Sequence, residues 1–253
     1  MIPELFLAGL EWPIATALIG FSFLGSFITV AFGIGGGGIL IAVFATLLPA
    51  TAIIPVHGLV QLGSNVGRAI LTFRHVHWEV VWAFLLGSLI GVGLGSVFVV
   101  DLNAAMIQLG VGMFIIWSIL AKPPAIMRRS SWITGAISSF LTMFFGATGA
   151  FVAAFVKSQQ FDKLRHTATH ATLMTIQHAL KIFAFGLLGF SFSHWAGLVT
   201  LLILSGFLGT IVGRRVLLRV DDKLFRLTLN IVLAGIAARL MYSGLTTLVK
   251  TGN

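Results

Sequence analysis

GIGGGGILIAVFATLL, residues 33–48, ends an apolar segment that begins near residue 14, and GATGAFVAAF, residues 146–155, lies in a second apolar segment at residues 130–156. Glycine destabilises a helix interior and readily adopts the positive φ angles that a chain reversal needs. Each glycine cluster therefore predicts a break, with a new half-helix that starts near Ile39 or near Ala150. The competing interpretation is that the glycines serve only close helix packing.

The composition places the chain in a membrane. Hydrophobic residues make up 58% of its 253 residues and charged residues 9%, whereas soluble domains carry roughly 25% charged residues. The mean hydropathy is +1.05. These values exclude a soluble enzyme, a nucleic-acid-binding domain and a disordered scaffold. Cysteine is absent, which excludes disulfides and thiolate metal sites. Residues 1–12 carry two acids and no Lys or Arg, so a cleavable signal peptide is not expected.

The remaining apolar segments are near the 20 residues that a membrane-spanning helix needs. They lie at residues 51–73, 78–100, 104–120, 164–187, 194–216 and 225–247. The sequence therefore predicts an all-α polytopic membrane protein. A plain bundle of eight spans is the alternative to helical hairpins at 14–48 and 130–156.

The two halves of the chain are similar. A shift of 113 residues places His57 on His170 and Arg68 on Lys181, and a shift of 111 aligns the two glycine clusters. We therefore predict two repeats, at residues 1–120 and 130–253, each with one glycine-broken hairpin and three spanning helices.

Basic residues predict the orientation of these repeats, because Lys and Arg concentrate in cytoplasmic loops. They cluster at Arg74, at Lys122 with Arg128 and Arg129, at Lys157 with Lys163 and Arg165, and at Arg214, Arg215, Arg219, Lys223 and Arg226. All four clusters are cytoplasmic only if each hairpin is re-entrant, entering and leaving on one side, with both termini and Asp101 outside. Each repeat then crosses three times, so the second is inverted.

Buried positive charge indicates an anion site. Arg68, Lys181 and Arg239 lie within predicted spans, whereas all seven acidic residues lie near segment ends. Two half-helix N-termini at mid-membrane would also attract an anion. The alternative for each cation is snorkelling of its long side chain to the membrane surface.

The predicted substrate site combines the glycine breaks with polar residues that share a helix face with Arg68 or Lys181. It comprises Gly36, Gly37, Gly38, His57, Gln61, Asn65, Arg68, Gly146, Thr148, Gly149, His170, Gln177, His178 and Lys181. Hydroxyls of Thr167 or Thr169 are further candidate donors. No catalytic residue, metal or cofactor is expected. A passive anion channel is the nearest alternative, and a membrane metalloenzyme that uses His166 and His170 is the distant one.

The two glycine stretches, the basic turn RHVHW at residues 74–78, GSLIGVGLGS at 87–96 and RHTATHATLMTIQHALKIFAFGLLGF at 165–190 together resemble the sulfite exporter TauE/SafE family over residues 14–247. The resemblance implies a secondary carrier of the bacterial inner membrane for small sulfur-containing or organic anions such as sulfite, sulfoacetate or other sulfonates and carboxylates, and we expect an exporter. From the predicted inverted repeats we expect alternating access, with the anion held between the repeats as one rocks against the other. The expected partners are this anion and the bilayer, without nucleic acid, and a homodimer is left open.

Overall fold

The computed structural model describes residues 6–32, 35–99, 104–121, 124–146, 148–216 and 222–251, and every regular element within these ranges is helical. This agrees with the predicted all-α class. Some residues of the predicted breaks and loops lie outside the described ranges: Gly33, Ile34, Asp101, Lys122, Ala147 and Arg219. Two of the seven acidic residues, Glu4 and Asp221, also lie outside them.

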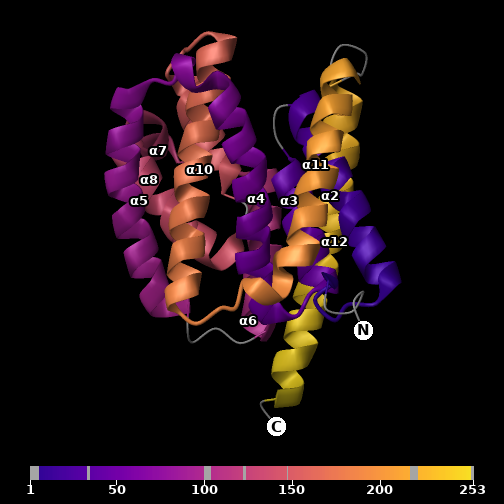
Figure 1. Cartoon of the computed structure of the whole chain (residues 1–253). Helices are drawn as coiled ribbons and strands as arrows, with labels where there is room; N and C mark the ends of the chain where they lie inside the picture. The colour runs from indigo at the N-terminus through magenta and orange to yellow at the C-terminus, as the bar shows by residue number, and fades with distance from the viewer. Residues whose placement is uncertain are drawn as a thin grey trace. The chain divides into compact units, whose positions relative to one another are not determined.

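The helices follow the predicted apolar segments closely (Figure 1). They are α2 Trp12–Phe32, α3 Gly36–Leu47, α4 Ala50–Thr72, η1 Phe73–His75, α5 Trp78–Val99, α6 Ala104–Leu120, α7 Ala125–Arg129, α8 Ser131–Phe145, α9 Gly149–Ser158, α10 Lys163–Leu187, η2 Ser193–Trp195, α11 Ala196–Val216 and α12 Asp222–Thr251. The short helix α7 was not predicted. The half-helices begin at Gly36 and Gly149, so the predicted starts near Ile39 and Ala150 were three residues and one residue late.

Both glycine clusters break the helix. Gly35 and Gly146 adopt φ angles of 112° and 78°, in the left-handed region that favours glycine. The legs after the breaks are short, because α3 has 12 residues and α9 has 10. At 1.5 Å per residue these are roughly 18 and 15 Å, well below the roughly 30 Å of a bilayer core. Neither leg can span a membrane alone.

Four helical stretches in the described residues are long and apolar enough to span a membrane. They are Trp12–Val30, Trp78–Val99, Ser193–Gly213 and Asn230–Lys250. Helices α4 and α10 reach 23 and 25 residues, but their polar side chains keep them out of this apolar set. The first hairpin is unequal, since its leg α2 reaches spanning length and α3 does not.

Packing divides the chain into two compact units. Unit 1 comprises Met1–His57, Leu102–Ala121 and Ser191–Asn253. In it α2 packs along α11, α6 along α12, and α3 against α2, α6 and α12. Gly209 of α11 lies against Phe23 of α2, and Gly213 lies against Phe27. Both numbers increase together, so α2 and α11 run parallel.

Unit 2 comprises Gly58–Asp101 and Lys122–Phe190. Here α5 packs along α8, and α10 packs against α5, α8 and α9 (Figure 1). Gly87 and Gly91 of α5 lie on the backbone of Trp132 and Ala136 of α8, so these helices are also parallel. The absence of side chains at both glycines allows this close approach.

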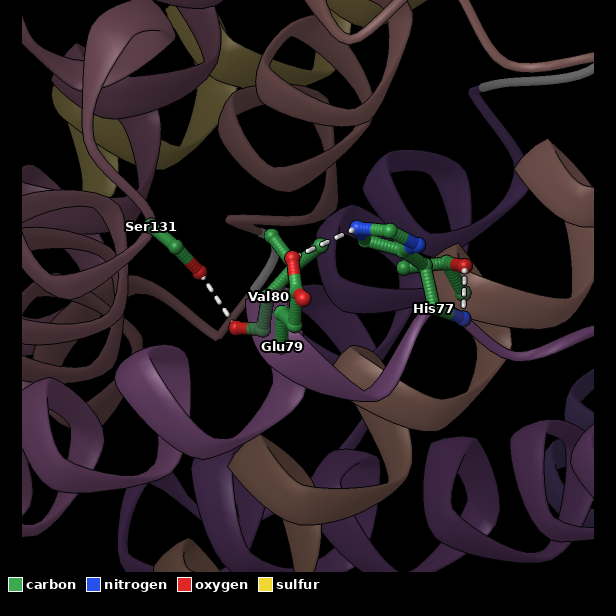
Figure 2. A network of polar contacts seen from close by, with 5 residues as sticks. His77, Glu79, Val80 and Ser131 are labelled. Carbon is green, nitrogen blue, oxygen red and sulfur yellow. Dashed lines mark hydrogen bonds and ion pairs between the residues drawn. The ribbon is translucent and has the colours of Figure 1, made fainter.

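One end of unit 2 gathers the starts of α5, α8 and α10. The Ser131 hydroxyl donates to the Val80 carbonyl, and the His77 imidazole pairs with the Glu79 carboxylate (Figure 2). The distance between His77 Nε2 and Glu79 Oε2 is 3.5 Å. The His77 backbone N–H donates to Thr169 Oγ1 over 3.1 Å. These contacts fix the η1–α5 turn to the beginnings of α8 and α10.

The same end also receives the end of α9, because the Ser158 hydroxyl donates to the Arg128 carbonyl at 2.6 Å. The α8–α9 hairpin therefore begins and ends at one end of unit 2. Basic side chains from three of the predicted cytoplasmic clusters are exposed on the residues around this end: Arg74, Arg128, Arg129, Lys157 and Arg165.

Candidate functional site

Lys181 of α10 is the most unusual polar side chain in unit 2, because none of it is exposed. Its ammonium donates to Thr142 Oγ1 of α8 at 3.3 Å, and the Thr142 hydroxyl donates in turn to the Gly146 carbonyl at 3.0 Å. Complete burial rules out the snorkelling alternative for Lys181. A chain of hydrogen bonds thus links the buried charge to the glycine that ends α8.

Gly58 of α4 leaves room for the Lys181 side chain. A Cβ added at Gly58 would lie 2.6 Å from Lys181 Cε and 3.4 Å from Nζ. Any larger residue would displace the end of the lysine. The position of the ammonium therefore depends on Gly58 from one side and on Thr142 from another.

Gln177 lies one turn before Lys181 on the same face of α10, and it meets α8 one turn before Thr142. Its Nε2 donates to Ser138 Oγ at 3.2 Å. Gln177 and Ser138 are fully buried. Within the described part of the chain Gln177 Oε1 has no hydrogen-bond partner. The seam between α8 and α10 therefore contains two polar pairs with the same spacing of four residues.

The N-cap of α9 lies two residues after Gly146, the residue that ends α8. Thr148 is fully buried, and its hydroxyl makes no hydrogen bond to the described residues, although it is the N-cap residue of α9. The first N–H groups of a helix lack intrahelical partners and carry a partial positive charge. A buried free hydroxyl and a helix N-terminus thus lie together.

His170 and Arg68 add polar groups to this region. The backbone of Gly149 and the positive charge of Arg68 both lie close enough to act on the His170 imidazole. Its Nε2 is buried without a partner among the described residues. The ring stacks on His166, with 6.4 Å between the ring centroids.

Arg68 is partly buried and makes its side-chain hydrogen bonds on its own helix. Its guanidinium donates to the Ser64 carbonyl at 3.3 Å and to Asn65 Oδ1 at 3.0 Å, and Asn65 Nδ2 donates to the Gln61 carbonyl at 2.7 Å. The predicted polar face of Gln61, Asn65 and Arg68 is therefore present on α4. No carboxylate pairs with Arg68 among the described residues.

The predicted residues of unit 1 surround the first break. His57 is fully buried, and its Nε2 lies 3.1 Å from the Gly37 carbonyl. Phe44 packs edge-on against the imidazole at 6.2 Å. A side chain at Gly36 would overlap the Gly25 carbonyl, whereas a Cβ at Gly38 would meet open space. Gly36 therefore serves the close packing of α2 on α3.

The structure divides the predicted site between the two units. Unit 2 holds Gln61, Asn65, Arg68, Gly146, Thr148, Gly149, His170, Gln177, His178 and Lys181, and unit 1 holds Gly36, Gly37, Gly38 and His57. A single site built from all of them stays a prediction.

The Thr169 hydroxyl accepts a hydrogen bond from the His77 backbone at the end of unit 2. A hydroxyl that accepts can also donate, so the role of Thr169 as a candidate donor stays a prediction. The side chain of Arg239, the third cation within a predicted span, is exposed on α12.

Three residues that contact Gln177 or Lys181 were not predicted from the sequence: Gly58, Ser138 and Thr142. Ser138 and Thr142 are four residues apart in an apolar segment, which was a usable signal for a polar helix face. Gly58 gave no such signal. Among the described residues no group of three or more His, Asp or Glu is placed to hold a metal ion.

Comparison with known proteins identifies a family. The family model described as Sulfite exporter TauE/SafE matches residues 18–240, which include both glycine breaks and every predicted site residue. No curated protein and no solved structure matches the chain.

Proposed function

Since the chain belongs to the sulfite exporter TauE/SafE family, whose members are multi-pass membrane transporters of small anions, we propose that it is a secondary transporter that exports a small sulfur-containing or organic anion. Sulfite, sulfoacetate and other sulfonates are the proposed substrates. The proposed location is the bacterial inner membrane, and the proposed mechanism is alternating access with the anion held between the two sequence repeats.

The burial of the Lys181 ammonium is the observation that best supports this proposal. An ammonium has three N–H donors, and within the described residues only Thr142 accepts from this one. The carboxylates of Glu11, Glu79 and Asp162 are exposed. An unpaired charge at membrane depth is costly and marks a substrate or ion pathway. A bound anion would neutralise Lys181 and accept its remaining hydrogen bonds.

The start of α9 supports the same function. The helix N-terminus, the free Thr148 hydroxyl and the nearby Arg68 charge all favour a negatively charged ligand. These groups and Lys181 are linked through the Gly146 turn. An anion that binds there would interact with both legs of the hairpin, and movement of the hairpin could then expose the anion to either side.

The α8–α9 hairpin also supports the proposed re-entrant topology. Its ends meet at one end of unit 2, where the basic side chains lie, and its legs have 15 and 10 residues. At 1.5 Å per residue, neither reaches the roughly 30 Å of a bilayer core. For the driving force we propose either proton coupling through His170 or His178, or uncoupled export down a gradient.

Counterflow in proteoliposomes tests the proposal. Vesicles loaded with unlabelled sulfite or a sulfonate should accumulate the labelled anion transiently, since a carrier exchanges substrate and a passive channel does not. Lys181→Ala and Arg68→Ala should abolish this exchange at unchanged folded yield. Arg239→Ala is the matched control, because this arginine is exposed on α12 and should leave exchange intact. Normal exchange in both site variants would overturn the proposed site.

A further inference from the structure

The Gln177 side chain has an unsatisfied hydrogen-bond acceptor. Its Nε2 is fixed by Ser138 at 3.2 Å, while its Oε1 is buried without a partner among the described residues. Buried polar atoms are nearly always paired, and an unpaired one costs free energy. Fixing Nε2 on Ser138 also fixes which end of the amide faces away from α8. The site therefore presents an amide oxygen that needs a donor.

Other groups assigned to the anion site can donate hydrogen bonds. One turn further along α10, the Lys181 ammonium offers N–H donors, and Thr148 offers a free hydroxyl at the α9 N-terminus. A fully deprotonated oxyanion would satisfy these donors and would leave Gln177 Oε1 unpaired. Two oxygen acceptors placed side by side also repel each other.

We propose that the substrate is a monoanionic sulfur oxyanion that carries its own hydroxyl group, with the hydroxyl donating to Gln177 Oε1 while the anionic oxygens accept from Lys181. Hydrogen sulfite and hydroxyalkanesulfonates share this chemistry. The inference rests on the proposed function, because it assigns a substrate class to the same anion site. Gln177 is then a specificity-determining residue, and Lys181 supplies the charge that any sulfonate needs.

Ethanesulfonate and 2-hydroxyethanesulfonate form a matched pair of probes. Both are monoanions over the working pH range, and they differ by one hydroxyl group. Their dissociation constants for the full-length protein follow from competition with labelled substrate in proteoliposomes. We expect the hydroxylated anion to bind roughly tenfold more tightly, since leaving the buried amide oxygen unpaired is costly.

One site variant and one control variant test whether Gln177 causes the preference for the hydroxylated anion. Gln177→Met keeps the length of the side chain but removes the amide, and it should bring the ratio of the two dissociation constants to about one. Ser139→Ala is the control: its hydroxyl is buried on α8 without a partner among the described residues, and Ser139 is not one of the residues to which the site is assigned. This control should keep both dissociation constants.

Labelled sulfite tests whether hydrogen sulfite, the other anion that carries its own hydroxyl group, is transported. Exchange at increasing pH should decline with the fraction of hydrogen sulfite, while exchange of 2-hydroxyethanesulfonate, whose charge does not change, reports any titration of the protein itself. Sulfite exchange that rises with pH relative to this reference would show that the dianion is carried, and would overturn the inference.

The outcomes separate the inference from the proposed function. Equal dissociation constants for the two sulfonates in the wild-type protein would overturn the inference, because Oε1 would then be satisfied by water or by the amide turned round, and sulfonate transport would still stand. Failure of sulfite and both sulfonates to bind or exchange would overturn the proposed function, and the inference with it.

Discussion

Substituting Gly58 by Ala should weaken anion binding through Lys181 without unfolding the protein. The added methyl group would lie 2.6 Å from Lys181 Cε, whereas non-bonded carbon atoms prefer about 3.5–4.0 Å. The end of the lysine must therefore move by about 1 Å. The fold can tolerate this shift, because the displaced atom belongs to a long and flexible side chain.

The size of the effect follows from the hydrogen bonds of the ammonium. Its distance to Thr142 Oγ1 is already 3.3 Å, near the upper limit for a hydrogen bond. Movement by about 1 Å breaks this bond and misaligns the ammonium with the anion. Hydrogen bonds to charged groups contribute about 1.5–3 kcal/mol. We therefore expect binding to weaken by roughly tenfold to a hundredfold.

Gly67→Ala is the matched control, because Gly67 lies on the same helix and a Cβ there meets nothing within 4 Å. Both substitutions should raise helix stability by about 0.5–1 kcal/mol, since Ala is a better helix former than Gly. The assay compares melting temperature and substrate dissociation constant for the two variants in proteoliposomes. A Gly58→Ala protein that binds substrate as tightly as Gly67→Ala would refute the role assigned to Lys181.

Three further predictions concern the fold. Gly36→Ala should lower the melting temperature, at a cost of about 1–3 kcal/mol, because its methyl group would overlap the Gly25 carbonyl; Gly38→Ala, whose methyl meets open space, should not, and equal melting temperatures would contradict the proposed packing. The Arg165 backbone N–H holds the pKa of Asp162 below its ordinary value of 3.8, so the stabilisation of α10 by this N-cap is present above pH 3.8 and is lost as the pH falls through the lower folded pKa. Asp162→Ala should remove that part of the acid dependence, as measured by thermal unfolding over a pH series. Reporter fusions after residues 75, 125, 160 and 220 should all report the cytoplasm, and an external signal at residue 220 would contradict the inverted repeat.

Most of the fold could be predicted from the sequence, because long apolar segments indicate lipid-facing helices and glycine clusters indicate the breaks. The start of α3 was misplaced because glycine propensity alone argues against helix at residues 36–38. Tight packing of Gly36 on Gly25 instead allows helix from Gly36 onward.

The charged part of the site could be predicted because Lys181 and Arg68 stand out in apolar segments. Their surroundings could not be predicted in the same way. Gly58 matters only because the Lys181 side chain lies against it, and Thr142 matters only because α8 and α10 pack in register. Helix periodicity identifies which residues share a face of one helix, but it does not identify the neighbouring helix that this face meets.

The packing inside each unit can be compared with the predicted repeat, and this comparison is independent of the residue shift from which the repeat was predicted. In unit 1 the first hairpin leg, α2, runs parallel to α11, and in unit 2 the corresponding leg of the second hairpin, α8, runs parallel to α5. Under the predicted repeat α2 corresponds to α8 and α11 corresponds to α5, so each hairpin packs on the equivalent helix of the other half. Both contacts use glycine on the crossing helix, at Gly209 and at Gly87. Under the predicted repeat each half therefore packs its hairpin on a helix of the other half, and compact units that combine parts of both halves are the expected result.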